Sequence, residues 1–165
     1  MQNIKDSFYV ALRGRLAALN PARTVTVLGV TRPAIIVAEN EVADSAEILP
    51  EAFYLAWGAA SAVASTERLH LPLLKLTCEI TYWTQGSQDL SSQDRGRTLA
   101  KLDEELLSIA APAHVALKDF SQTPPADLGA NIFWTAPSLA TSKLDGNKLT
   151  RIATIEVFSH MEASQ

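Results

Sequence analysis

The sequence predicts an α+β protein in which two helices pack on one face of a mostly antiparallel sheet of about five to six strands. Two amphipathic segments, residues 4–19 and 91–110, carry apolar side chains three or four positions apart, which is the spacing of a helix face. Several other segments are rich in β-branched residues or alternate between apolar and polar side chains, as strands do. Neither a repeat nor a linker divides the 165 residues, so we expect a single domain over 1–165.

The composition limits the classes of function. Hydrophobic residues make up 47% and charged residues 19% of the chain, which is ordinary for a globular protein. The net charge of −4 and the scattered basic residues argue against direct nucleic-acid binding. Charges at Lys5, Asp6 and Arg13 exclude a secretory signal, and we expect no membrane-spanning segment. We therefore expect a protein made in the cytoplasm.

The first elements follow from local patterns. The apolar stripe predicts a helix over 4–19, with Asn3 as its cap. Residues 23–30 and 31–41 read as two strands, with a bend over Gly29 to Arg32. The pattern in 40–71 is open between a strand with a loop and a short helix.

A strand is predicted over residues 73–83, because apolar and polar side chains alternate there. The alternation places Cys78 inside and Glu79 outside. Ser91 and Asp94 resemble a capping box that opens the second helix. The connection over 112–129 contains paired prolines, which favour an extended course.

The last strands are predicted over 130–136 and 149–160. Asp145 and Gly146 lie between them and form a tight-turn dipeptide, so the two strands are expected to form a hairpin.

Few residues suggest catalysis, and we assign no catalytic, cofactor-binding or metal-ligating residue. The only cysteine, Cys78, reads as a core residue because nothing places a cation or base beside it. The run Asp103 to Glu105 reads as the solvated face of the second helix. The three histidines, His70, His114 and His160, show no metal-binding spacing.

A small set of residues forms a candidate interface. Phe53, Tyr54 and Trp57 are interface anchors if their segment is exposed, and core residues if it is buried. Arg95 and Arg97 could contact an acidic partner, although solvated arginines are the plainer interpretation.

The order of elements resembles that of bacteriophage tail terminator and tail-completion proteins. The resemblance rests on an N-terminal helix (4–19), a long strand ending in a polar loop (74–88), an Arg- and Leu-bearing helix (94–110) and two closing strands (131–135 and 150–160). It implies a non-enzymatic structural protein that forms a homo-oligomer, a six-membered ring, on a tail-tube or head-completion protein. It also implies a virion component without cofactors. Longer stretches at 40–71 and 112–129 depart from the family pattern.

Two other functions remain open from the residues alone. The first is a ligand-binding α+β domain whose apolar pocket is lined by aromatic side chains, namely Phe53, Tyr54, Trp57, Trp83 and Trp134. The second is an enzyme that works through Cys78 or the carboxylates of 103–105.

Overall fold

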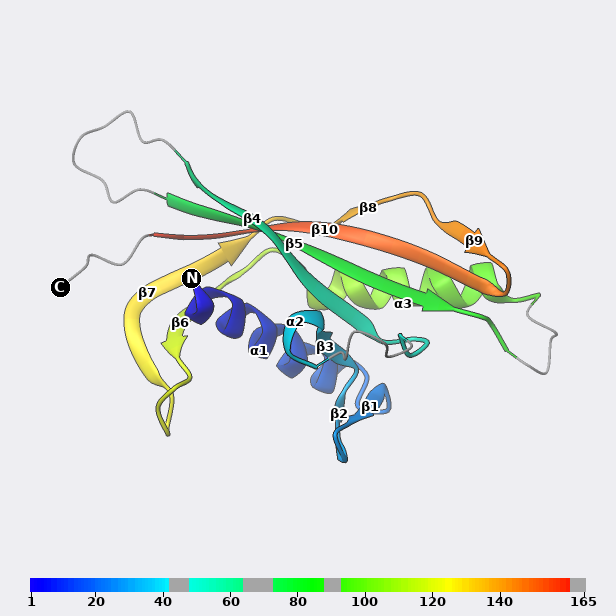
Figure 1. Cartoon of the computed structure of the whole chain (residues 1–165), viewed down its shortest axis with the longest axis horizontal. Helices are drawn as coiled ribbons and strands as arrows, with labels where there is room; N and C mark the ends of the chain where they lie inside the picture. Colours follow the sequence, from blue (N-terminus) through cyan, green and yellow to red (C-terminus); the bar gives the residue numbers. More distant parts are fainter. Residues whose placement is uncertain (42–47, 64–72, 88–92, 161–165) are drawn as a thin grey trace.

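The computed structural model describes residues 1–41, 48–63, 73–87 and 93–160, and it has an α+β fold (Figure 1). The helices are α1 (Gln2–Leu19), α2 (Ala38–Glu41) and α3 (Arg95–Ile109). The strands are β1 (Thr24–Val27), β2 (Val30–Pro33), β3 (Ile35–Val37), β4 (Phe53–Val63), β5 (Leu73–Thr84), β6 (His114–Asp119), β7 (Ala126–Trp134), β8 (Ser138–Leu139), β9 (Lys143–Asp145) and β10 (Lys148–His160). The predicted fold class is confirmed.

The main sheet has eight strands, more than the five to six predicted. Its order is β3-β4-β5-β10-β7-β6, with β8 and β9 also paired to β10. All pairings in it are antiparallel except that of β3 with β4. The sheet curls into a half-barrel (Figure 1), while β1 and β2 form a separate two-stranded hairpin.

The helices do not form the simple two-helix layer that the sequence predicts. Helix α3 lies along β5 and β10, whereas α1 packs mainly beside β6 and also touches α3 and β3. A third, short helix, α2, follows β3 directly. Because the sheet is curved rather than flat, its helices lie at different angles within the half-barrel (Figure 1).

One hydrophobic core joins the helices to the sheet. Helix α1 contributes Phe8, Leu12 and Leu16, which are fully buried. The ring of Phe8 meets the rings of Trp57 and Trp134 edge to face, at centroid distances of 5.7 and 5.1 Å. On β5 the inward residues are Leu76, Cys78, Ile80 and Tyr82, as the alternation predicts. Burial of these side chains is the main force that holds helices and sheet together.

The first helix is confirmed, but its predicted cap is wrong. Helix α1 begins at Gln2 with Met1 as N-cap, so Asn3 lies inside its first turn.

The two strands predicted over 23–41 have other bounds in the structure. The chain turns earlier, at Leu28 and Gly29, which have φ values of 50° and 79°. These positive φ values close the β1–β2 hairpin.

The open segment and the predicted connection both contain strands. Residues 53–63 form β4, so this part of the 40–71 segment is a strand, while residues 40 and 41 end the short helix α2. The 112–129 connection does not keep the extended course that its paired prolines predicted: it contains β6 and the first part of β7, which pair antiparallel, and both prolines lie in the turn between them. The predicted Asp145–Gly146 turn joins β9 to β10, and β7 also pairs with β10.

The predicted capping box is wrong: α3 begins at Arg95 with Asp94 itself as the N-cap, so Asp94 is not a helical residue that pairs with a cap at Ser91, which lies outside the described residues. Among the described residues, no helix has both the length and the apolar character needed to span a bilayer.

Candidate functional site

The strand β5 keeps Cys78 inside the core, with an exposed fraction of 0%. Burial raises the pKa of the Cys78 thiol, and the neighbouring charge of Glu79 raises it further. A nucleophilic cysteine needs the opposite shift. Cys78 is therefore a core residue in this structure, as the alternation of the strand predicts.

The carboxylates of α3 are not a simple solvated face, which corrects the sequence-based expectation. Only Glu104 is exposed. Asp103 accepts a 2.6 Å hydrogen bond from the hydroxyl of Tyr82, and Arg151 lies 3.4 Å from its other oxygen. These partners come from β5 and β10, so the side of α3 that faces the sheet carries an acid with a structural role.

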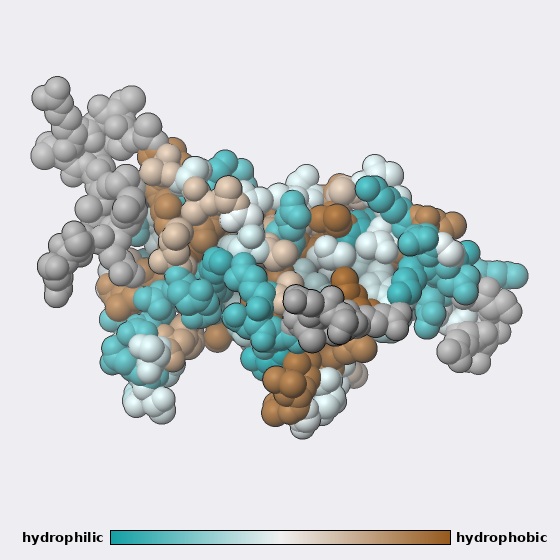
Figure 2. Space-filling view, in the orientation of Figure 1, coloured by the Kyte–Doolittle hydropathy of each residue, from teal (hydrophilic) through white to brown (hydrophobic). Residues whose placement is uncertain are grey.

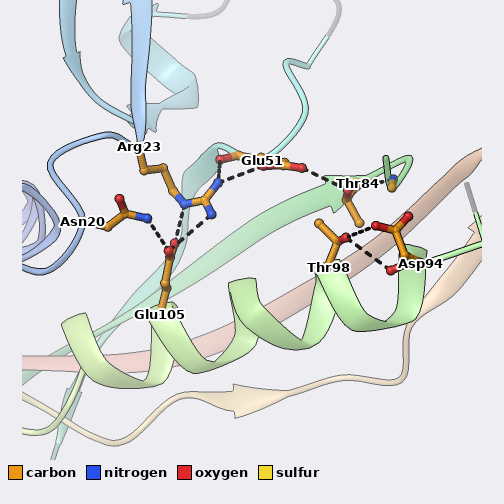
Figure 3. Close-up of polar contacts among 8 residues, drawn as sticks. Asn20, Arg23, Glu51, Thr84, Asp94, Thr98 and Glu105 are labelled. Carbon is orange, nitrogen blue, oxygen red and sulfur yellow. Dashed lines mark hydrogen bonds and ion pairs between the residues drawn. The ribbon is translucent and has the colours of Figure 1, made fainter. Parts of the chain in front are cut away.

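A second polar cluster joins four parts of the chain (Figure 3). Arg23, just before β1, binds both oxygens of Glu105 on α3 and lies 3.1 Å from the carboxylate of Glu51. Asn20 donates a 2.6 Å hydrogen bond to Glu105, and Thr84 donates one of 3.4 Å to Glu51. The side chains of Arg23 and Glu105 are 16% and 17% exposed. The cluster fixes the base of the β1–β2 hairpin against α3 and the start of β4.

The sequence analysis missed this cluster. Arg23 and Glu105 are 82 residues apart, and neither belongs to a local motif. The only related signal in the sequence is that single charged residues stand near the ends of predicted helices and strands. One guanidinium is shared by two carboxylates, an arrangement suited to holding elements together.

The histidines are separated in the fold. His114 and His160 are exposed on β6 and at the end of β10, while His70 lies outside the described residues. Within the described part of the chain, no group of three or more His, Cys, Asp or Glu residues could hold a metal ion.

The candidate aromatic anchors are mostly core residues. Phe53 and Tyr54 are buried, and the hydroxyl of Tyr54 accepts a 2.6 Å hydrogen bond from the Leu49 amide. Trp57 is half-buried against Phe8. Of the two alternatives left open by the sequence, the structure supports the core for Phe53 and Tyr54, because both side chains are buried.

The two other tryptophans bind backbone carbonyls. Trp83 donates to the carbonyl of Ile48 at 2.9 Å, and Trp134 donates to that of Ala110 at 3.1 Å. Arg15 stacks over Trp134 and donates to the carbonyls of Ile109 and Ala111 at the end of α3. These aromatic side chains are engaged in packing, so no observation favours the aromatic-lined pocket.

The candidate arginines lie at the start of α3. Arg97 is exposed, and Arg95 is half-buried and donates to the carbonyl of Gly146 at 3.4 Å. They are not close to the aromatic residues with which the sequence analysis grouped them: Arg95 meets the β9–β10 turn, whereas Phe53 packs inside the sheet on Tyr82.

The surface carries an open apolar hollow of about 400 Å³ between α1 and β6. It is lined mainly by apolar residues, namely Val10, Ala11, Val115, Ala116, Phe120 and Pro125. A second hollow, of about 490 Å³, lies between the ends of α1 and α3 around Arg15 and Pro112. Neither includes any of the five aromatic residues proposed for a ligand pocket.

One long edge of the sheet has no strand beside it in the described part of the chain. Strand β3 pairs only with Phe53 to Leu55, so β4 from Ala56 onward is paired on one side alone, to β5. The six residues from Gly58 to Val63 are all exposed and carry no charge. This segment, the β4 edge, extends past the helices to one end of the molecule (Figure 1).

The tip of the β1–β2 hairpin is a second exposed apolar feature. Leu28 is 94% exposed and Val30 is 61% exposed. Figure 2 shows a brown projection over this hairpin at the lower edge of the molecule. The sequence analysis placed a bend here but did not recognise a protruding apolar turn.

Comparison with known proteins adds little. No protein-family model matches the chain, and no curated protein matches it. A solved structure that bears no functional name aligns over 99% of this chain and 97% of its own, at 12% sequence identity and a TM-score of 0.43. A likeness at this level carries no argument about family or function.

Proposed function

We propose that the chain is a non-enzymatic structural protein of a phage or prophage tail, of the tail terminator or head–tail joining type, which self-associates into a ring. The observation that carries the proposal is the β4 edge. An uncharged strand edge with free N–H and C=O groups is a template for pairing with another chain, and natural proteins usually block such edges with charges, proline or a covering element. Here none of the six exposed residues from Gly58 to Val63 is charged or proline.

The remaining chemistry of the chain supports the same proposal. The residues that an enzyme would most plausibly use are engaged in structure: Cys78 is buried, and Asp103 is bound by Tyr82 and Arg151. The order of elements that carries the resemblance to tail terminators is present as α1, β5, α3, β7 and β10. On this proposal the protein meets a tail-tube or head-completion protein, is made in the cytoplasm and ends in the virion.

The test is light scattering on the eluting protein over a wide concentration range, with negative-stain images of any large fraction. We expect ring-shaped particles. Lysine at Ala60 or Ala62 on the β4 edge should lower the ring fraction, because a buried charge at a strand pair is costly. Lysine at Ala100, an exposed position of α3, adds the same charge elsewhere and should leave the rings intact.

The proposal fails if the wild-type protein is monomeric throughout and fails to cross-link at the highest concentration. It also fails if rings form but Ala60→Lys, Ala62→Lys and Ala100→Lys behave alike, since the β4 edge would then have no part in assembly.

A further inference from the structure

We infer that the tip of the β1–β2 hairpin inserts into the apolar hollow between α1 and β6 of a second copy of the chain. The inference rests on the proposed function, because it takes a second copy of the chain as the occupant of the hollow. Leu28 is the inserted residue, with Val30 beside it.

Leu28 is an unfavourable choice for its position unless its side chain has a partner. Leu28 and Gly29 have φ values of 50° and 79°, which is the backbone of a two-residue hairpin turn of type I′. This turn favours Asn-Gly, because asparagine tolerates positive φ and leucine does not. A side chain held in a disfavoured backbone region points to a function when the fold itself does not require it.

The exposure of Leu28 adds a second cost. At 94%, it is the most exposed of the large hydrophobic residues in the described part of the chain. Its neighbour across the turn, Val30, is also exposed, and the tip of the hairpin projects from the rest of the molecule (Figures 1 and 2). A projecting apolar tip that is left this exposed by the described residues has the form of an interface anchor.

The hollow between α1 and β6 matches this tip in chemistry. Its volume of about 400 Å³ leaves room for the side chains of both Leu28 and Val30. Val10, Ala11, Val115 and Phe120 line it, and Lys118 is the only charged residue of its lining. An apolar side chain that enters would leave water for an apolar surface without displacing an ion pair.

The two features lie on different parts of the chain. The hollow borders α1 through Ser7, Val10 and Ala11, whereas the hairpin follows the C-terminal end of that helix. In the ring that we propose, the tip of each copy enters the hollow of the next copy, and such a heterologous contact generates a ring when the rotation closes; a two-fold dimer would instead exchange both tips. The contact therefore adds to the β4 edge a head-to-tail link of the type that a ring needs.

The test uses one variant on each surface. Leu28→Asn removes the apolar tip but installs the preferred Asn-Gly turn, so the monomer should become more resistant to heat while association weakens. Val10→Glu places a charge at the hollow, at a position of α1 that is 43% exposed and tolerates a good helix former. Each variant should raise the half-dissociation concentration by roughly thirtyfold or more, as loss of an interface anchor does.

Mixing the two variants tests the direction of the contact. Leu28→Asn keeps an intact hollow and Val10→Glu keeps an intact tip, so in the mixture the contact can form only between the two different variants, and mixing should restore part of the association that each variant alone has lost. Leu144→Asn is the matched control, because Leu144 is 60% exposed on β9, away from both surfaces, and its loss should leave assembly unchanged.

Two outcomes overturn the inference. If Leu28→Asn and Val10→Glu both assemble like the wild type, the tip and hollow do not meet, while the proposed ring-forming function stands. If the wild-type protein is monomeric at every concentration and a Leu28→Cys, Val10→Cys double variant yields no cross-linked ladder, the second copy is not the occupant and the proposed function fails with the inference.

Discussion

The hydroxyl of Tyr82 on β5 donates a 2.6 Å hydrogen bond to Asp103 on α3, and this contact fixes the helix to the middle of the sheet. Tyr82 is fully buried and its ring packs on Phe53, so the hydroxyl would have no solvent to replace Asp103. Hydrogen bonds to a charged acceptor in such a setting contribute more than neutral ones.

Replacing Tyr82 with Phe should therefore lower the free energy of unfolding by about 2 kcal/mol. Asp103→Ala should cost more, because it also leaves Arg151 without its carboxylate. Chemical denaturation measures the free energy of unfolding of both variants. Glu104→Ala, at the exposed neighbouring position, is the control and should change stability by less than about 0.5 kcal/mol. Equal losses for Tyr82→Phe and Glu104→Ala would contradict the role assigned to the hydrogen bond.

The Arg23–Glu105 pair should show strong energetic coupling. In a double-mutant cycle with Arg23→Met and Glu105→Gln, we expect a coupling energy of about 1 to 3 kcal/mol, because both side chains are largely removed from solvent. The more exposed pair Lys5–Glu39 offers the control, for which about 0.5 kcal/mol is expected. Similar coupling for the two pairs would show that Arg23 does not fix the hairpin.

Cys78 should be protected from thiol reagents in the folded protein. Its burial and the raised pKa of its thiol both suppress the reactive thiolate. Labelling at pH 8 should proceed only as fast as the protein opens, and it should become rapid in denaturant. Rapid labelling of the native protein would instead place the thiol within reach of solvent.

Alkaline pH should destabilise the fold through Cys78 and Tyr82. Burial raises the pKa of both groups above their ordinary values of 9.0 and 10.0, so the folded protein keeps their protons when the unfolded chain has released them. The unfolded state then binds fewer protons, and stability falls as the pH rises above about 9. Denaturation series across this range should show a shallower decline for Cys78→Ala and Tyr82→Phe than for the wild type. An unchanged slope in both variants would contradict this origin of the pH dependence.

The sequence could predict elements whose burial pattern is local. Strand β5 alternates because one face of the sheet meets the core, and the stripes of α1 and α3 follow from the same requirement. Strand β4 shows no such pattern after Trp57, because Gly58 to Val63 are exposed on both faces. Its small side chains carry no periodicity from which a strand could be inferred.

The candidate interface was harder to predict than the fold. The aromatic side chains of Phe53 and Tyr54 suggested an interface, yet both lie at the start of β4 and are buried in the core. The apolar tip at Leu28 escaped notice because a leucine before a glycine inside a β-rich stretch looks like part of a strand. Leu28 stands out by its positive φ and its exposed side chain, and neither property can be read from a residue pattern.

Strand β10 lies at residues 148–160, and it pairs with β5, β7, β8 and β9. During synthesis the ribosome releases the earlier strands first, at about 5–20 residues per second. Until β10 emerges, β5 and β7 have no strand to join them, and the half-barrel cannot close. The nascent chain therefore waits with the β10-facing edges of β5 and β7 unpaired, and the sheet is completed only after β10 has been translated. A protein of this topology would depend on cellular chaperones during that interval more than one whose sheet is built from consecutive hairpins.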